Sequence, residues 1–185
     1  MNNKTMKKMS KTALAKQLRS RTQPELIDLI MRLYSAIPEA ADYLVIELGG
    51  EDYELELLAK AKKKVRNEFF PARGLGRLSL SAAKAAIKDF GRVSKNPANC
   101  IDLQLYYVEC GVEFTNTYGD IDERFYNSME SVYQDVIDML ENMDDEEMVR
   151  QFRDRLRAVV DDASNIGWGF HDYLTEAYYQ AFPEE

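Results

Sequence analysis

The sequence predicts an all-α protein of eight or nine helices in antiparallel helical hairpins, either a compact bundle or a short HEAT-like array. Apolar residues recur at three- and four-residue spacing through most of the 185 residues, which is the period of an amphipathic helix. Helix-start and helix-stop signals separate these segments, and no stretch shows strand-like alternation or a hairpin turn. The tetratricopeptide pattern is missing, whereas HEAT-like pairs have no sharp signature, so both arrangements stay open.

The first quarter of the chain carries signals for three helices. Ser10 suits the N-cap of the first. The segment 22–25, TQPE, is a capping-box pattern with proline in the first turn and predicts the second helix. Pro38 starts a third helix, which the glycine pair at 49–50 ends.

A fourth helix is expected over 52–70 and a fifth after the linker-like segment 71–78, with Ser79 or Ser81 as its N-cap. The fourth helix has an apolar stripe on one side and basic residues largely on the other. Its exposed cations form a candidate basic patch made of Lys60, Lys62, Lys63, Lys64 and Arg66.

The sixth helix follows the Asn96-Pro97 break and is apolar nearly all round. Its apolar residues fall on two opposed faces, and a helix of this kind is normally central and covered on both sides. A narrow polar stripe interrupts the pattern, and its members are Asp102, Glu109, Glu113 and Asn116.

Three turn signals predict the boundaries of the last three helices. Gly119 suits the position after a helix end, and Asp120 with Glu123 is a capping-box pattern for the seventh helix. The sixth and seventh helices therefore form an antiparallel hairpin. The segment 144–147 is a further capping box that opens the eighth helix, and the segment 164–174, SNIGWGFHDYL, breaks it and begins the ninth.

Charge divides the chain more sharply than the net value of −8 suggests. Residues 1–95 contain 19 Lys and Arg against 11 Asp and Glu, whereas residues 96–185 contain 5 against 21. Such asymmetry fits a nucleic-acid or membrane-surface partner for the basic half, or a contact between the two halves within one chain or between two chains. We expect residues 1–9 to be disordered and residues 10–183 to form a single helical domain, basic to about residue 95 and acidic after it.

Several features favour a cytoplasmic protein without a membrane partner. No apolar run approaches the roughly 18 residues that span a bilayer, and the start of the chain does not resemble a secretory signal. Cys100 and Cys110 are expected on one helix, about 15 Å apart at 1.5 Å per residue. We therefore expect no disulfide between them, and free thiols fit a reducing compartment.

The crowded region around the central turn and the start of the last helix supplies candidate binding residues. Its aromatic and acidic side chains would suit a cationic or stacking ligand, although most of its aromatic residues are equally explained as core. The residues without a clear structural role are Glu113, Asn116, Tyr118, Asn127, Trp168 and His171. The chain has one histidine and no Glu-x-x-His pair, so we expect no metal, no cofactor and no catalytic residue.

The segments EFTNTYGDIDERFYNSMESVY, LQLYYVECGV and IGWGFHDYL resemble those of a bacterial domain-of-unknown-function family with the motifs EFTNxYGDIDExFYNS and IGWGFHD. The opening MSKTALAKQLRSRTQPELIDLIMRLY and the central NEFFPARG extend the resemblance over residues 9–180. The resemblance implies a small, stand-alone helical protein and transfers no functional role to any residue.

The sequence therefore favours a non-enzymatic helical protein-interaction module that contacts a protein partner or itself. Two alternatives stay open. One is a small-ligand binder or enzyme that uses the aromatic and acidic cluster near the central turn. The lesser one is nucleic-acid binding through residues 60–95, because clustered Lys and Arg on one helix face can bind phosphate.

Overall fold

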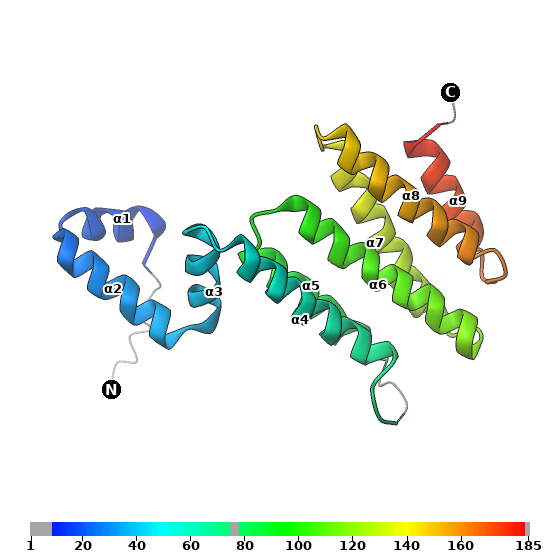
Figure 1. The fold of residues 1–185 in the computed structure, drawn as a ribbon, viewed down its shortest axis with the longest axis horizontal. Helices are drawn as coiled ribbons and strands as arrows, with labels where there is room; N and C mark the ends of the chain where they lie inside the picture. Colours follow the sequence, from blue (N-terminus) through cyan, green and yellow to red (C-terminus); the bar gives the residue numbers. More distant parts are fainter. Residues whose placement is uncertain (1–8, 75–77, 184–185) are drawn as a thin grey trace, which may run out of the picture. The chain divides into compact units, whose positions relative to one another are not determined.

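The computed structural model describes residues 9–74 and 78–183 (Figure 1). Residues 1–8, 75–77 and 184–185 lie outside this description. The expectation of a disordered N-terminus therefore falls, apart from Met9, outside the described residues, as does the middle of the linker-like segment 71–78.

Over the described residues the chain forms nine α-helices and no strand, which confirms the all-α prediction. The helices are α1 (Lys11–Arg19), α2 (Gln23–Ala36), α3 (Pro38–Glu47), α4 (Glu51–Phe69), α5 (Leu80–Val93), α6 (Pro97–Tyr118), α7 (Glu123–Glu141), α8 (Glu146–Asp162) and α9 (Phe170–Ala181).

Contacts group these helices into two units, Met1–Val45 and Ile46–Glu185, and each is described by itself. The first unit contains α1, α2 and most of α3. Its capping signals form as expected: the Ala13 N–H donates to Ser10 Oγ at 3.2 Å, and the Thr22 N–H donates to Glu25 Oε2 at 2.8 Å. Neither α1 nor α2 buries a single residue.

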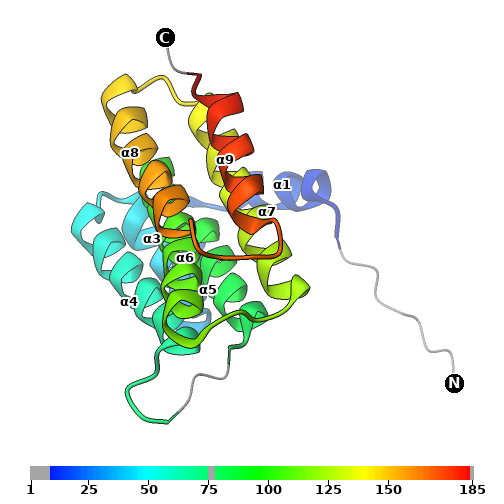
Figure 2. The same ribbon diagram turned by 90° about the vertical axis from the view of Figure 1, so that its right-hand side faces the viewer.

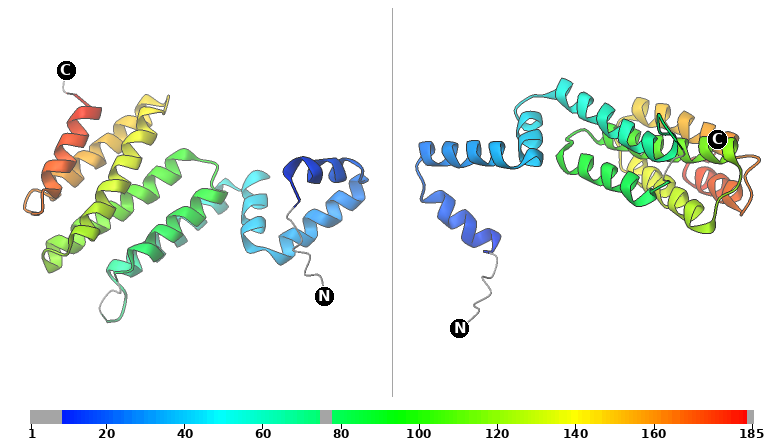
Figure 3. Two further views of the ribbon diagram at one scale, coloured as in Figure 1. Left: turned by 180° about the vertical axis from the view of Figure 1, so that it is seen from behind. Right: turned by 90° about the horizontal axis from the view of Figure 1, so that it is seen from below.

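The second unit is a row of three helical pairs, α4 with α5, α6 with α7, and α8 with α9. The pairs lie side by side in Figure 1 and, seen from behind, in the left view of Figure 3, whereas Figure 2 looks along the row with α8 and α9 towards the viewer. Within the row α6 packs against both α4 and α8, and α7 packs against α9. The helices of this unit therefore form antiparallel hairpins that pack on one another.

Helix α6 lies at the centre of the second unit. It packs against α4, α5, α7 and α8, which confirms the prediction from its two apolar faces. Ten of its residues are buried, and they come from both faces: Ala98, Ile101, Leu103, Leu105, Tyr107, Val108, Cys110, Gly111, Val112 and Thr115. Both cysteines lie on α6 and are free thiols, as expected.

Two helix starts differ from the sequence prediction. The N-cap of α7 is Asp122, whose side chain accepts the Phe125 N–H at 2.9 Å, and not Asp120. Asp120 Oδ1 instead accepts a hydrogen bond from the Tyr126 hydroxyl at 2.9 Å. The N-cap of α8 is likewise Asp145, one residue after the predicted one. Gly119 has a φ of 91°, which agrees with its predicted place at a helix end.

Gly111 lets α6 and α7 approach each other closely. A Cβ added at this position would collide with Sδ of Met129, which is completely buried on α7. Gly91 of α5 provides a contrast, because no atom lies within 4 Å of the corresponding Cβ position. The two helical glycines therefore differ in packing and share the same flexibility in the unfolded chain.

We expect Gly111→Ala to lower the free energy of unfolding by about 1–2 kcal/mol, because overpacking outweighs the gain in helix propensity. Gly91→Ala is the matched control and should raise it by about 0.5 kcal/mol. Urea unfolding followed by circular dichroism measures both. Equal stabilisation of the two variants would show that α6 and α7 do not meet at Gly111.

Candidate functional site

The α6 polar stripe, Asp102, Glu109, Glu113 and Asn116, bonds to the helices on either side of α6. Asp102 contacts both neighbours, Glu109 contacts α8 and Glu113 contacts α4. Asn116 completes the set, because its Nδ2 donates to the carbonyl of Asp162 at the end of α8, at 2.8 Å. Every member of the stripe therefore joins two helices.

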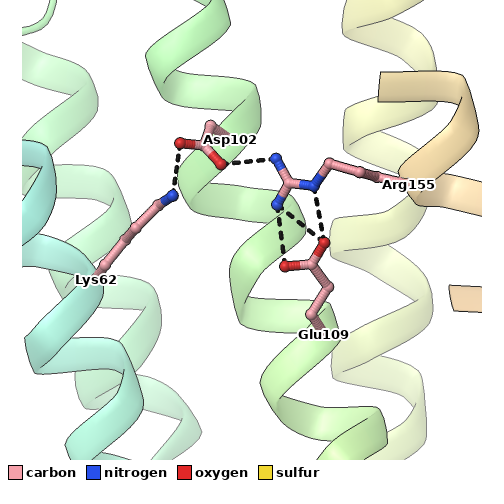
Figure 4. Close-up of polar contacts among 4 residues, drawn as sticks. All are labelled: Lys62, Asp102, Glu109 and Arg155. Carbon is pink, nitrogen blue, oxygen red and sulfur yellow. Dashed lines mark hydrogen bonds and ion pairs between the residues drawn. The ribbon is translucent and has the colours of Figure 1, made fainter. Parts of the chain in front are cut away.

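Arg155 of α8 lies between two of these carboxylates (Figure 4). Its Nη1 donates to Asp102 Oδ1 at 2.7 Å, and its Nε and Nη2 donate to the two oxygens of Glu109, each at 2.9 Å. The second oxygen of Asp102 accepts from Lys62 Nζ of α4 at 2.6 Å. Burial lowers the pKa of Arg155, but the hydrogen bonds to Glu109 and Asp102 outweigh it, and the net pKa is raised. Arg155 therefore stays charged.

A second ion pair lies further along the stripe. Arg66 of α4 donates through Nη2 to Glu113 Oε1 at 2.7 Å and through Nη1 to Glu113 Oε2. These hydrogen bonds hold the pKa of Glu113 below its usual value, despite partial burial. A bidentate pair of this kind fixes orientation as well as charge. Lys62 and Arg66 belong to the basic half of the sequence, and Asp102 and Glu113 to the acidic half, so the two halves face each other within the second unit.

A groove runs beside these ion pairs between α6 and α8, with a volume of about 520 Å³. This volume lies within the usual range of ligand sites. We refer to it as the α6–α8 groove; its lining is Glu109, Val112, Glu113, Asn116, Thr117, Arg155, Ala158, Val159 and Asp162. Because it offers three carboxylates against one guanidinium, a cationic or hydrogen-bonding group suits it better than an anion.

The six candidate binding residues do not gather in one place. Glu113 and Asn116 line the α6–α8 groove, and both have structural partners. Tyr118 and Trp168 are strongly exposed, at 59% and 64%. Asn127 is exposed on α7. His171 is partly buried on α9, with Nδ1 3.9 Å from Asp172 Oδ1 and Nε2 3.5 Å from the hydroxyl of Thr175.

The central turn does meet the start of the last helix. A Cβ on Gly167 would stand 3.6 Å from Asp120 Oδ2, so the α6–α7 and α8–α9 turns are adjacent. Behind them the rings of Tyr126 and Phe170 lie 5.1 Å apart, and both are buried. Trp168 has a φ of 62°, an uncommon conformation for a bulky residue. The aromatic residues of this region thus divide into a packed core and exposed side chains on the turns.

Two of the five residues in the candidate basic patch are engaged with carboxylates. Lys62 pairs with Asp102 and Arg66 with Glu113. Lys60, Lys63 and Lys64 are exposed. Three exposed lysines of α4 are therefore available for contacts with phosphate.

Glu54 is a further buried charge, located near the start of α4. Only 4% of its surface is exposed, and its Oε1 accepts from Ser94 Oγ at 2.6 Å, Asn99 Nδ2 at 3.0 Å and the Asn96 N–H at 3.2 Å. Burial raises the pKa of Glu54, but these hydrogen bonds outweigh it and the net pKa is lowered. Glu54 thus fastens α4 to the turn between α5 and α6.

Sequence analysis missed Arg155 and Asp162, the two α8 residues that complete the site. A signal for Arg155 was present. It lies three residues after Phe152 and four before Val159, on the inward stripe of α8, where an unpaired charge is costly. A cation at such a position predicts an acidic partner on the neighbouring helix, and the α6 polar stripe supplies it.

Among residues 9–74 and 78–183, no group of three or more His, Cys, Asp or Glu side chains is arranged to hold a metal ion.

No helix in the described ranges combines the length and the apolar character needed to cross a membrane.

The fold and the groove define an all-α protein whose second unit is a row of stacked helical hairpins. The chain belongs to a family of unknown function, DUF6155, whose model matches residues 9–182. Comparisons with curated proteins and with solved structures found no match. The expected membership of a family of unknown function is thus confirmed, and the family description assigns no activity.

We expect Arg155→Met to lower the free energy of unfolding by about 1–3 kcal/mol, because it leaves Asp102 and Glu109 without their shared partner in a half-buried position. The control is Arg150→Met on the same helix. Arg150 pairs with Glu147 one turn away and is largely exposed, so its loss should change stability by less than about 0.5 kcal/mol. Urea unfolding of both variants measures the difference, and equal effects would contradict a structural role for the Arg155 cluster.

Proposed function

We propose that this protein is a non-enzymatic helical protein-interaction module, and that its first unit carries the binding surface. The observation behind this proposal is the exposure of apolar side chains on α1, α2 and α3. Nine of the fifteen large hydrophobic residues that are exposed in the described part of the chain lie between residues 9 and 45. The second unit, which is far longer, has the other six.

The exposed residues of α2 follow the helical repeat. Ile27, Ile30, Met31 and Tyr34 are 43–54% exposed and stand at positions i, i+3, i+4 and i+7, which share one side of a helix. We call these four residues the α2 apolar face. The polar residues Asp28 and Arg32, which pair with each other at 3.0 Å, border this face. The opposite side of α2 carries the less exposed Leu26 and Leu29. The helix is thus apolar on two sides, and the α2 apolar face is the more exposed of them.

An uncovered apolar face of this kind is unfavourable in water. Monomeric proteins rarely expose contiguous apolar patches larger than a few hundred Å², and larger patches mark protein contacts. From their exposed fractions, the four residues of the α2 apolar face expose on the order of 350 Å², and because only about 57% of a typical interface is apolar, such a face fits an interface of about 600 Å² per partner, somewhat below the roughly 800 Å² of a standard one. Burial against another protein would remove this surface from water.

A second candidate function is small-ligand binding, which the α6–α8 groove favours. Glu113 and Asn116 line it, and its volume suits a small molecule. The groove's lining contains no histidine, cysteine or serine, and two of its three carboxylates, Glu109 and Glu113, are paired with arginine. These features support binding of a cationic group more than catalysis, and they rank this function second.

Site-specific photo-crosslinking tests the interaction function. A benzoylphenylalanine at Met31, on the α2 apolar face, should give intermolecular protein adducts in cells that express the full chain. The same probe at Leu48 is the control, because Leu48 is 85% exposed but belongs to the second unit. We expect several-fold more intermolecular adduct from Met31. Adducts confined to the same chain, or equal yields from the two positions, would exclude the first unit as the binding surface.

A further inference from the structure

We infer that the α2 apolar face is the contact between two copies of this chain, packed about a two-fold axis. This inference rests on the proposed function and names the partner. The argument has three parts: the apolar surface that the chain itself offers, the distribution of charge within the first unit, and the area available for burial.

An apolar face needs an apolar counter-surface. In the second unit the exposed large hydrophobic residues are Leu48, Leu55, Tyr118, Trp168, Tyr173 and Tyr179, and they are dispersed over five different helices or turns. The richest apolar surface in the described part of the chain is the α2 apolar face with its neighbours. A second copy of the same face is therefore the best match that the chain offers. A two-fold axis brings identical patches together, as in most homodimers.

Charge within the first unit is also arranged in a self-complementary way. Residues 10–21 contain four basic residues and no acid, and residues 22–45 contain one basic residue and four acids. The described part of the unit is thus nearly neutral, with a positive first helix and a negative remainder. Antiparallel packing of two copies allows the positive segment of each to face the negative segment of the other, whereas a strongly charged unit would repel its own copy.

The area is sufficient for a specific dimer. Two α2 apolar faces would bury on the order of 700 Å² of apolar surface, and because only about 57% of a typical interface is apolar, the whole contact would reach about 1,200 Å², at the lower end of the standard range for stable interfaces. Burial would also supply the core that the first unit lacks, since neither α1 nor α2 buries a residue in the single chain. Short helices without packing are marginal in water, so dimerisation and ordering of this unit would be coupled.

Analytical ultracentrifugation of the full chain tests the inference. The wild type should sediment as a dimer, at twice the chain mass of 21.3 kDa, at a chain concentration of about 50 µM. Ile27→Asp/Met31→Asp should weaken self-association by at least about 100-fold, because it places two charges in the centre of the contact. The control Leu48→Asp/Leu55→Asp adds the same charges to exposed apolar positions of the second unit and should leave the dimer intact. Hydrogen–deuterium exchange checks that the helices of α4–α9 keep their protection in both variants.

A monomeric wild type at 50 µM, or a dimer that survives the α2 substitutions, would overturn the inference. A crosslinking experiment on mixed ¹⁴N- and ¹⁵N-labelled chains, with the photo-probe at position 31, distinguishes failure of the dimer from failure of the proposed interaction function. Mixed-isotope adducts between position 31 and residues 9–45 support the dimer. Intermolecular adducts to other proteins alone would refute the dimer and keep the interaction function, and adducts within one chain alone would refute both.

Discussion

The second unit depends on the way α6 combines a nearly continuous apolar surface with one polar stripe. Its apolar residues pack on four neighbouring helices, which places the polar stripe between α4 and α8. Charged groups at such a position need partners, and Lys62, Arg66 and Arg155 provide them. These ion pairs fix the rotation of α6 relative to both neighbours. The groove between α6 and α8, and the side chains that line it, follow from that rotation.

The two units differ in how many residues their helices bury. In the second unit every helix contributes buried residues, and the buried carboxylate of Glu54 accepts three hydrogen bonds. The first unit has the same helical pattern and properly capped helices, yet α1 and α2 bury nothing. Apolar side chains that follow a helical repeat and stay exposed indicate a missing partner. The proposed interaction function and the dimer both follow from this contrast.

Much of the fold could be predicted because its signals are local. Thr22 with Glu25, Ser79 and Gly119 mark helix ends through hydrogen bonds and backbone angles within a few residues, and the central place of α6 is visible in its own residues. The site was harder, because its partners are distant in sequence. Glu113 and Asn116 were singled out as polar residues without a role, but their partners, Arg66 and the Asp162 carbonyl, lie 47 and 46 positions away. The exposure of the α2 apolar face was not foreseen, because helical spacing identifies apolar positions but does not say whether another element covers them.

Hydrogen–deuterium exchange of the full chain over a range of concentrations tests most directly the claim that the second unit holds its own core and the first unit needs a partner. The account predicts that amides of α6 are strongly protected at every concentration, because this helix is buried within one chain. Amides of α1 and α2 should exchange rapidly at low concentration and become protected as the concentration rises. Strong protection of α1 and α2 at the lowest concentration, equal to that at the highest, would contradict the account.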